Sequence, residues 1–316
     1  MLNRSTHRRW ILGSMAVLVV VTLAMPALGM SRRSTGHEGV WGRSLRVQVG
    51  NVSIAYRSLG HGRPLVLLQG SGAAMDVWDP LMISRLAAER RVIVFDYRGI
   101  GGSTDEPSVP MTIDMLADDT AGLIKALHLR RADVLGWSLG GYVAQRLVEL
   151  HPNRVRRLVL ISTDPGGSNA VLAAPDILDL DERVLLGQAS IDEILSLLFP
   201  PDQLDAGQAW LERYLSQPDC CESVAYETGL RQLDAESVWQ TGSGAWDGLV
   251  EIHRPTLILK GALDIDIPPV NEQLIEDRIP NATLVTFEDA GHGLPLQDPE
   301  LVAGLVNGFL GEGSST

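Results

Sequence analysis

The sequence predicts an α/β fold, in which a mostly parallel, twisted sheet is flanked by helices. Short runs of β-branched and aliphatic residues alternate with stretches of helical period over Leu45–Ser162 and again over Thr256–Leu310. Between these regions, residues 164–248 contain helical pieces that proline and glycine separate, without a clear strand. We therefore expect a core in two parts, residues 45–163 and 249–311. Residues 164–248, here called the lid segment, would be a helical insertion between them.

The expected strands follow from these runs. Leu45–Val49 and Val52–Ser58 are joined at Gly50-Asn51, which predicts an opening antiparallel hairpin. Pro64–Gln69 is a continuous apolar run, as expected of a strand that is buried on both faces. Further strands are expected at Arg91–Asp96, Ala132–Gly136, Val155–Ser162, Thr256–Lys260 and Thr283–Phe287.

The expected helices are marked by period and by caps. Thr112–Leu127 carries apolar residues at helical spacing behind a threonine N-cap, and the helix Gly140–His151 is ended by Pro152. Other core helices are expected at Trp78–Arg90, Val270–Arg278 and Pro299–Leu310, and lid helices at Ile191–Leu198, Ala209–Leu215 and Glu222–Leu233.

Residues 1–33 differ in kind from the rest. A basic start that includes Arg8-Arg9 precedes an apolar run over residues 10–30, and Ala27-Leu28-Gly29 is a small-x-small cleavage pattern. This arrangement is typical of a signal peptide, and the run of about 20 residues is also long enough for a transmembrane helix. We expect an exported protein or one anchored in a membrane by this segment, with the domain outside the cytoplasm.

The charge and the metal-binding residue types exclude several functions. The first 33 residues hold five arginines and no acid, so residues 34–316 carry a formal charge of −18, against −13 for the whole chain. A polypeptide this acidic repels the phosphate backbone of nucleic acids, so we expect no nucleic-acid partner. The chain has no C-x-x-C pair, and its seven histidines are scattered, so we expect no metal site.

The strongest local motif is Gly136-Trp137-Ser138-Leu139-Gly140, which follows an expected strand and opens an expected helix. In that position G-x-S-x-G forms a strained turn that lifts the serine hydroxyl above the sheet. A capping serine in a glycine-rich turn is the plainer alternative. The placement between ADVLG and YVAQRLVEL favours a nucleophile at Ser138.

Several stretches together resemble the α/β-hydrolase superfamily, in its serine-nucleophile branch of esterase-like and peptidase-like members. They are LVLLQGSG, VIVFDYRGIGGST, ADVLGWSLGGYVAQ, RLVLIST, PTLILKGALDIDIPP and FEDAGHGLPLQDPE. The resemblance covers about residues 45–311, apart from the lid segment, and implies an α/β-hydrolase fold. It also implies a chain order of serine, acid and histidine in the catalytic triad.

That order places the other two members of the triad. His292 lies in a Gly-His-Gly turn after the last expected strand and would be the general base. Asp264 follows the strand Thr256–Lys260 and would orient the imidazole. Asp266, two residues on, and Asp164, after the strand Val155–Ser162, stay open as alternative acids.

The oxyanion of the tetrahedral intermediate requires two backbone donors. We expect the N–H of Leu139, directly after the nucleophile, and the N–H of Ser71, in the loop after Pro64–Gln69. Most family members have His-Gly where this chain has Gln69-Gly70, and glutamine can brace the loop through similar hydrogen bonds.

These residues predict a serine hydrolase that cleaves an ester-like bond of a small, apolar substrate through an acyl-enzyme, without a cofactor. The same triad serves lactone, amide, C–C bond and perhydrolase chemistry, and a receptor-like hydrolase with slow turnover is a further alternative. The leucines and tryptophans of the lid segment, among them Trp210, Trp239 and Trp246, suggest an apolar roof over the pocket.

Overall fold

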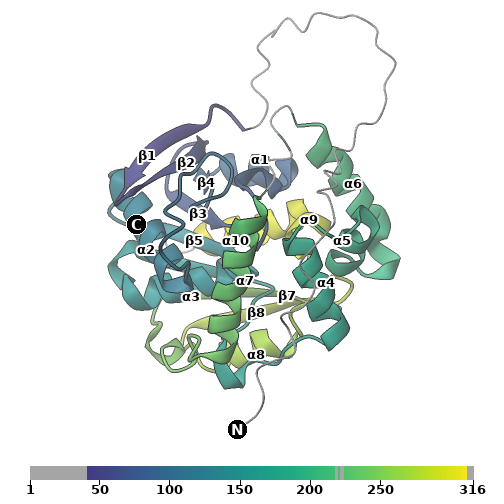
Figure 1. Ribbon diagram of the computed structural model, residues 1–316. Helices are drawn as coiled ribbons and strands as arrows, with labels where there is room; N and C mark the ends of the chain where they lie inside the picture. The colour runs from purple at the N-terminus through teal and green to yellow at the C-terminus, as the bar shows by residue number, and fades with distance from the viewer. Residues whose placement is uncertain (1–40, 218–219, 221–223, 312–316) are drawn as a thin grey trace, which may run out of the picture. The chain divides into compact units, whose positions relative to one another are not determined.

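The computed structural model describes residues 41–217, 220 and 224–311 (Figure 1). The predicted signal peptide or anchor, residues 1–33, lies outside these described residues. Within them, no helix is both long and apolar enough to cross a membrane.

The centre of the fold is an eight-stranded sheet in the order β1-β2-β4-β3-β5-β6-β7-β8. β1 pairs antiparallel with β2, and β2 with β4, while all the other pairs are parallel. The predicted hairpin and mostly parallel sheet are therefore confirmed. The strands are β1 (Leu45–Val49), β2 (Val52–Leu59), β3 (Pro64–Leu68), β4 (Arg91–Phe95), β5 (Ala132–Trp137), β6 (Val155–Ile161), β7 (Thr256–Gly261) and β8 (Ala282–Phe287).

Helices cover both faces of this sheet (Figure 1). Side chains of α2, α3 and α8 belong to one hydrophobic core, and those of α1 and α10 belong to a second. Alternate residues of β3 divide between the two, with Val66 in the first and Leu67 in the second. These helices are α1 (Pro80–Ala87), α2 (Ile113–Ala126), α3 (Leu139–Leu150), α8 (Val270–Glu276) and α10 (Pro299–Gly311), with the short α9 (Leu294–Gln297) before α10.

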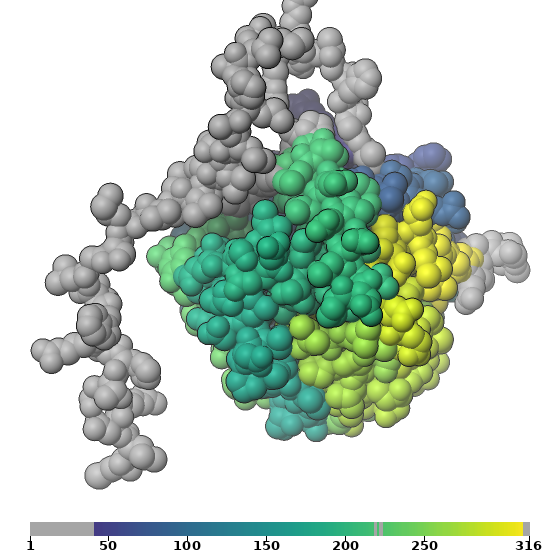
Figure 2. Space-filling view, turned by 90° about the vertical axis from the view of Figure 1, so that its right-hand side faces the viewer, coloured from purple at the N-terminus to yellow at the C-terminus, as the bar shows by residue number. Residues whose placement is uncertain are grey.

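The lid segment contributes four α-helices between β6 and β7, which are α4 (Pro175–Leu185), α5 (Ile191–Leu198), α6 (Leu204–Leu215) and α7 (Tyr226–Thr241). In Figure 2, the teal and green surface of α4–α6 occupies the centre of the face turned to the viewer, beside a yellow-green and yellow surface from later in the chain. α5 matches the expected helix, whereas α6 begins earlier and α7 runs further than expected. α4 was not predicted. It begins with Pro175 at its first position, where proline is favourable. In the sequence, prolines of the lid segment were interpreted as breaks between helices.

Candidate active site

Ser138 occupies the sharp turn between β5 and α3. Its backbone has φ 56° and ψ −126°, a conformation that costs a non-glycine residue about 1–3 kcal/mol. Its hydroxyl makes no capping hydrogen bond to α3, so the alternative of a capping serine is wrong. The turn is held by its backbone, because the Ser138 N–H donates to the Ile161 carbonyl at 3.0 Å. A strained backbone thus presents a hydroxyl that makes no capping hydrogen bond and no other side-chain hydrogen bond to the described residues.

The glycines around Ser138 allow this close approach. A Cβ at Gly140 would lie 2.0 Å from the Leu68 carbonyl oxygen, and one at Gly136 would lie 2.2 Å from the Gly140 carbonyl oxygen. Both contacts are with backbone, which cannot rotate away. Only glycine at these two positions lets β3, β5 and α3 meet below the serine.

His292 and Asp264 form a buried pair at the carboxyl ends of the sheet. The Asp264 Oδ2 lies 3.0 Å from the His292 Nδ1. The other Asp264 oxygen accepts hydrogen bonds from the backbone N–H groups of Asp266 and Ile267, at 3.0 and 2.8 Å. The His292 carbonyl accepts from the Trp137 indole at 2.9 Å, which ties its loop to β5. Asp264 is therefore positioned to orient the imidazole through Nδ1.

The two alternative acids occupy different places. Asp164 does not contact His292, because its carboxylate accepts hydrogen bonds from Tyr142 Oη, Trp239 Nε1 and the Gly166 N–H, at 2.8, 3.0 and 2.7 Å. Asp266 does contact the imidazole, but on the other side, with its Oδ2 3.3 Å from Nε2. The imidazole thus lies between two carboxyl groups that are two residues apart in the chain.

This arrangement favours a charged imidazole. Burial alone would lower the pKa of His292, but Asp264 and Asp266 outweigh burial and raise it to about 10. Burial likewise raises the pKa of Asp266 to about 8, against the opposing effect of His292. A base that takes a proton at Nε2 must be neutral. For His292 to act in that way, its Nε2 must separate from Asp266.

The loop after β3 lies directly against the nucleophile. A Cβ at Gly70 would be 3.3 Å from the Ser138 Cβ. Gln69 spans the base of this loop, since its Nε2 donates to the Phe95 carbonyl at 2.9 Å and to the Ala73 carbonyl at 3.5 Å. It makes the bracing contacts expected of it. The Ser71 hydroxyl donates to Glu236 of α7, which holds the loop to the lid segment. Leu139 begins α3, where first-turn N–H groups have no intrahelical acceptor.

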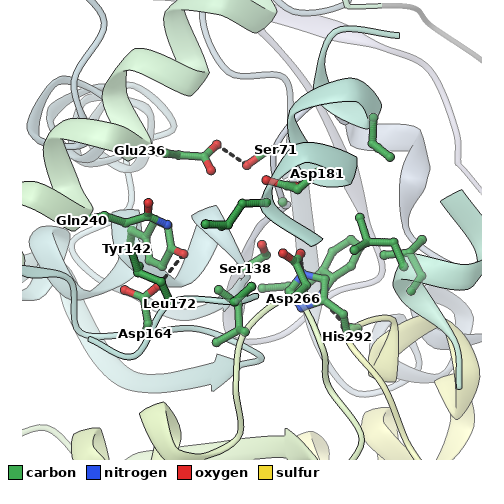
Figure 3. A pocket seen from close by; sticks show the side chains of 18 of the residues that line it. Ser71, Ser138, Tyr142, Asp164, Leu172, Asp181, Glu236, Gln240, Asp266 and His292 are labelled. Atoms are coloured by element: carbon green, nitrogen blue, oxygen red, sulfur yellow. Dashed lines mark hydrogen bonds and ion pairs between the residues drawn. The ribbon is translucent and has the colours of Figure 1, made fainter. Parts of the chain in front are cut away.

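A cavity of about 70 Å³ joins these groups, and Ser71, Ser138 and His292 all line it (Figure 3). The sheet side supplies these three residues, and the lid segment supplies most of the apolar wall. Leucines of that segment are in this wall, but Trp210, Trp239 and Trp246 do not line the cavity. The tryptophans pack elsewhere, for example Trp239 on Tyr142 with ring centroids 5.1 Å apart. The aliphatic lining is Val171, Leu172, Ala173, Leu178, Val184, Leu197, Leu198 and Ile267.

The family is shown by a comparison with known proteins. A family model described as the alpha/beta hydrolase fold matches residues 63–299. The chain belongs to the α/β-hydrolase family. This hydrolase is 26% identical to a pimeloyl-[acyl-carrier protein] methyl ester esterase of Aeromonas hydrophila, over 82% of this chain and 100% of the relative. It is 28% identical to a 2-hydroxymuconate semialdehyde hydrolase of a Pseudomonas species, over 80% and 88% of the two chains.

Solved structures agree with the family. The hydrolase superposes on an alpha/beta hydrolase fold protein from Chitinophaga pinensis with a TM-score of 0.76 and 27% identity, over 85% of this chain and 97% of the other. The predicted fold and the prediction of a hydrolase enzyme are confirmed. The relatives support the general kind of reaction, which is hydrolysis.

Several residues of the hydrolase's cavity were not found from the sequence. Asp181 of α4 and Glu236 of α7 both line it, yet each looks like an ordinary surface carboxylate in its helix. Behind the nucleophile, the Thr163 hydroxyl donates to the Ser138 carbonyl at 3.0 Å, and its N–H donates to the buried Glu272 at 3.1 Å. In the described part of the chain, no group of three or more His, Cys, Asp and Glu side chains could hold a metal ion.

Proposed function

We propose that this protein is a serine hydrolase that cleaves an ester-like bond of a small substrate through an acyl-enzyme. One observation carries the proposal. The Ser138 hydroxyl, free of any capping role, faces the same cavity as His292, whose Nδ1 lies 3.0 Å from Asp264. A nucleophile, a base and an orienting acid are the parts that acyl transfer requires. The relative from Aeromonas hydrophila, by its name a methyl ester esterase, supports an ester as the bond.

The proposed reaction begins when Ser138 Oγ attacks the ester carbonyl and His292 Nε2 takes the hydroxyl proton. Asp264 stabilises the imidazolium that forms, through Nδ1. The N–H groups of Leu139 and Ser71 would hold the oxyanion. The alcohol leaves with the proton from Nε2, and water, activated by the same nitrogen, releases the acid from Ser138. The Asp266 carboxyl must leave Nε2 before the first proton transfer, because it occupies the nitrogen that has to accept the Ser138 proton.

A covalent probe tests the proposal directly. We expect a fluorophosphonate to label the purified protein at Ser138, and the Ser138→Ala variant to take up no label while its thermal unfolding stays that of a folded protein. A peptide map of the labelled protein identifies the modified residue. Undiminished labelling of the Ser138→Ala variant would remove Ser138 from the mechanism.

A further inference from the structure

Four carboxyl groups line the cavity beside the nucleophile. They belong to Asp164, Asp181, Glu236 and Asp266, and they come from the loop after β6, from α4, from α7 and from the loop after β7. Figure 3 shows Asp181 and Glu236 above Ser138, with Asp164 and Asp266 on either side below them. No lysine or arginine is among the described residues that line this cavity, and His292 is its one basic side chain. The wall of the pocket is thus strongly acidic.

For two of these carboxyl groups, neighbouring groups of the protein stabilise the ionised form. Asp164 accepts three hydrogen bonds from Tyr142, Trp239 and the Gly166 backbone. Asp266 faces the His292 Nε2 at 3.3 Å. These contacts explain why the two groups can be buried beside the sheet.

Asp181 and Glu236 are different. Asp181 makes no hydrogen bond or ion pair with any residue in the described ranges, although its carboxyl group faces the cavity (Figure 3). Glu236 is only 8% exposed, and its contact is with an uncharged group, the Ser71 hydroxyl. Burial raises the pKa of both carboxyl groups, and for Glu236 the neighbouring Asp181 raises it further. The one basic side chain in the cavity wall, His292, opposes this effect at Asp181, but its imidazole already lies against Asp264 and Asp266.

Carboxyl groups that are enclosed together and outnumber the cations beside them are costly to ionise, because each loses hydration and repels the next. A ligand cation that enters the same cavity reverses both effects. Leu172 and Leu178 lie in the same wall and can cover the alkyl part of such a ligand. The wall therefore combines what an alkylammonium group requires, a negative charge for its head and an apolar surface for its carbons.

We infer that this hydrolase selects substrates that carry an ammonium group close to the scissile ester, and that Asp181 and Glu236 bind this group. The inference rests on the proposed ester hydrolysis and names its substrate class. It differs from the apolar substrate expected from the sequence, because four carboxyl groups and only one basic side chain, His292, are among the described residues that line the cavity.

Matched esters test the preference. 2-(Dimethylamino)ethyl acetate and 3-methylbutyl acetate have nearly the same shape and differ in a protonated nitrogen at neutral pH. Alanine methyl ester and methyl 2-methylpropanoate place the same difference on the acyl side. We expect kcat/KM to be at least about tenfold higher for the charged member of at least one pair, the size of one hydrogen bond to a charged group. Ratios near or below one in both pairs would overturn the inference.

Substitutions assign the preference to its residues. In Asp181→Asn and Glu236→Gln, the ratio for the preferred pair should fall several-fold, and in the double variant it should approach one. Asp176→Asn is the matched control, since Asp176 is an exposed carboxylate of the same helix as Asp181 and lies outside the cavity wall. Its ratio should stay that of the unmodified protein. A ratio that is unchanged in the double variant would show that other groups carry the preference.

A binding measurement separates this inference from the proposed reaction. In the Ser138→Ala variant, dimethylethanolammonium should raise the unfolding temperature saturably, whereas 3-methylbutanol should not, and Asp181→Asn/Glu236→Gln added to that variant should abolish the increase. If the ammonium ion stabilises the protein but no ester is cleaved, the proposed reaction fails and the cation site stands. If neutral esters are cleaved through Ser138 and the ammonium ion has no effect, the reaction stands and the inference fails.

Discussion

Asp264 and Asp266 are two residues apart and contact opposite nitrogens of the same imidazole. Asp264 is fully occupied, because its second oxygen accepts two backbone N–H groups. Among the described residues, the imidazole is the one ion-pair partner of the Asp266 side chain, which lies at Nε2, the nitrogen that must take the proton of Ser138. The two carboxyl groups should therefore affect the base in opposite ways.

Loss of the orienting acid should be the more damaging change. We expect Asp264→Asn to lower kcat by roughly 10⁴-fold, as in other triads in which the wrong tautomer results. Asp164→Asn should cost far less turnover, because Asp164 does not contact His292. Steady-state kinetics on one ester measure both variants. A larger loss in Asp164→Asn than in Asp264→Asn would move the acid to the loop after β6.

The pH dependence of turnover should report Asp266. A base is active only when it is unprotonated, and the pKa of His292 is raised to about 10, so kcat/KM for an uncharged ester should increase with pH through the alkaline range. Asp266→Asn removes one of the carboxyl groups that favour the imidazolium. The increase should then occur at a pH lower by about one unit or more. Identical pH profiles for the two proteins would show that Asp266 does not hold the proton on His292.

A single site residue can be predicted from the sequence when it lies in a short motif or when its place in the chain order identifies it. Ser138, Asp264 and His292 were predicted in this way, and the structure brings Asp264 and His292 together and places Ser138 and His292 on one cavity. Asp181 and Glu236 could not be found, because their exposure depends on how α4 and α7 pack. No local pattern records that packing.

The strand-turn-helix element around Ser138 leaves no room for a side chain at its glycines. Gly140 lies where β3 and α3 are closest, and any side chain there meets backbone. Gly308, in the middle of α10, is exposed and would place a Cβ in open space. A side chain is therefore sterically excluded at Gly140 but not at Gly308.

We expect Gly140→Ala to lower the free energy of unfolding by about 3 kcal/mol or more, because the added Cβ forces the backbone apart. The same substitution at Gly308 should leave stability unchanged or raise it by up to about 1 kcal/mol, since alanine is the better helix former. Urea unfolding of both variants makes the comparison. Equal effects at the two positions would contradict the account of the turn.

The elements of the core were predictable, whereas those of the lid segment were predictable only in part. The buried strands and the capped α2 follow from local patterns, and Thr112 caps α2 by accepting from the Met115 N–H at 3.1 Å. In the lid segment, α4 and the ends of α6 and α7 were not predicted. The lid helices pack on the core outside the repeating α/β order. The apolar pattern of such a helix is compatible with several helix lengths, so it does not fix where the helix begins and ends.

At the scale of the whole molecule, the hydrophobic cores on the two faces of the sheet are built from residues 41–311 of the described chain. Residues 1–33 lie outside the described residues. The export or membrane-anchoring role of those residues stays a prediction, made from their sequence alone.

A shortened chain and the mature protein test this prediction together. A protein that begins near Arg32 should be soluble and as active as the full chain. Mass spectrometry of protein recovered outside the cytoplasm should find an N-terminus near Met30 if the segment is a cleaved signal, or the intact segment if it is an anchor. Recovery of the full-length chain only from the soluble cytoplasmic fraction would contradict both.

The cavity has walls from different parts of the chain. The proposed reacting groups, Ser138 and His292, belong to the loops of the sheet, whereas Asp181, Glu236 and most of the apolar lining belong to the lid segment. Apart from the hydrogen bond between Ser71 and Glu236, the two walls can therefore change separately under natural selection. Substitutions on α4 and α7 can change the substrate specificity of a descendant while Ser138 and His292 stay in place. Duplicated copies of such a gene can therefore diverge in the substrates that their products cleave.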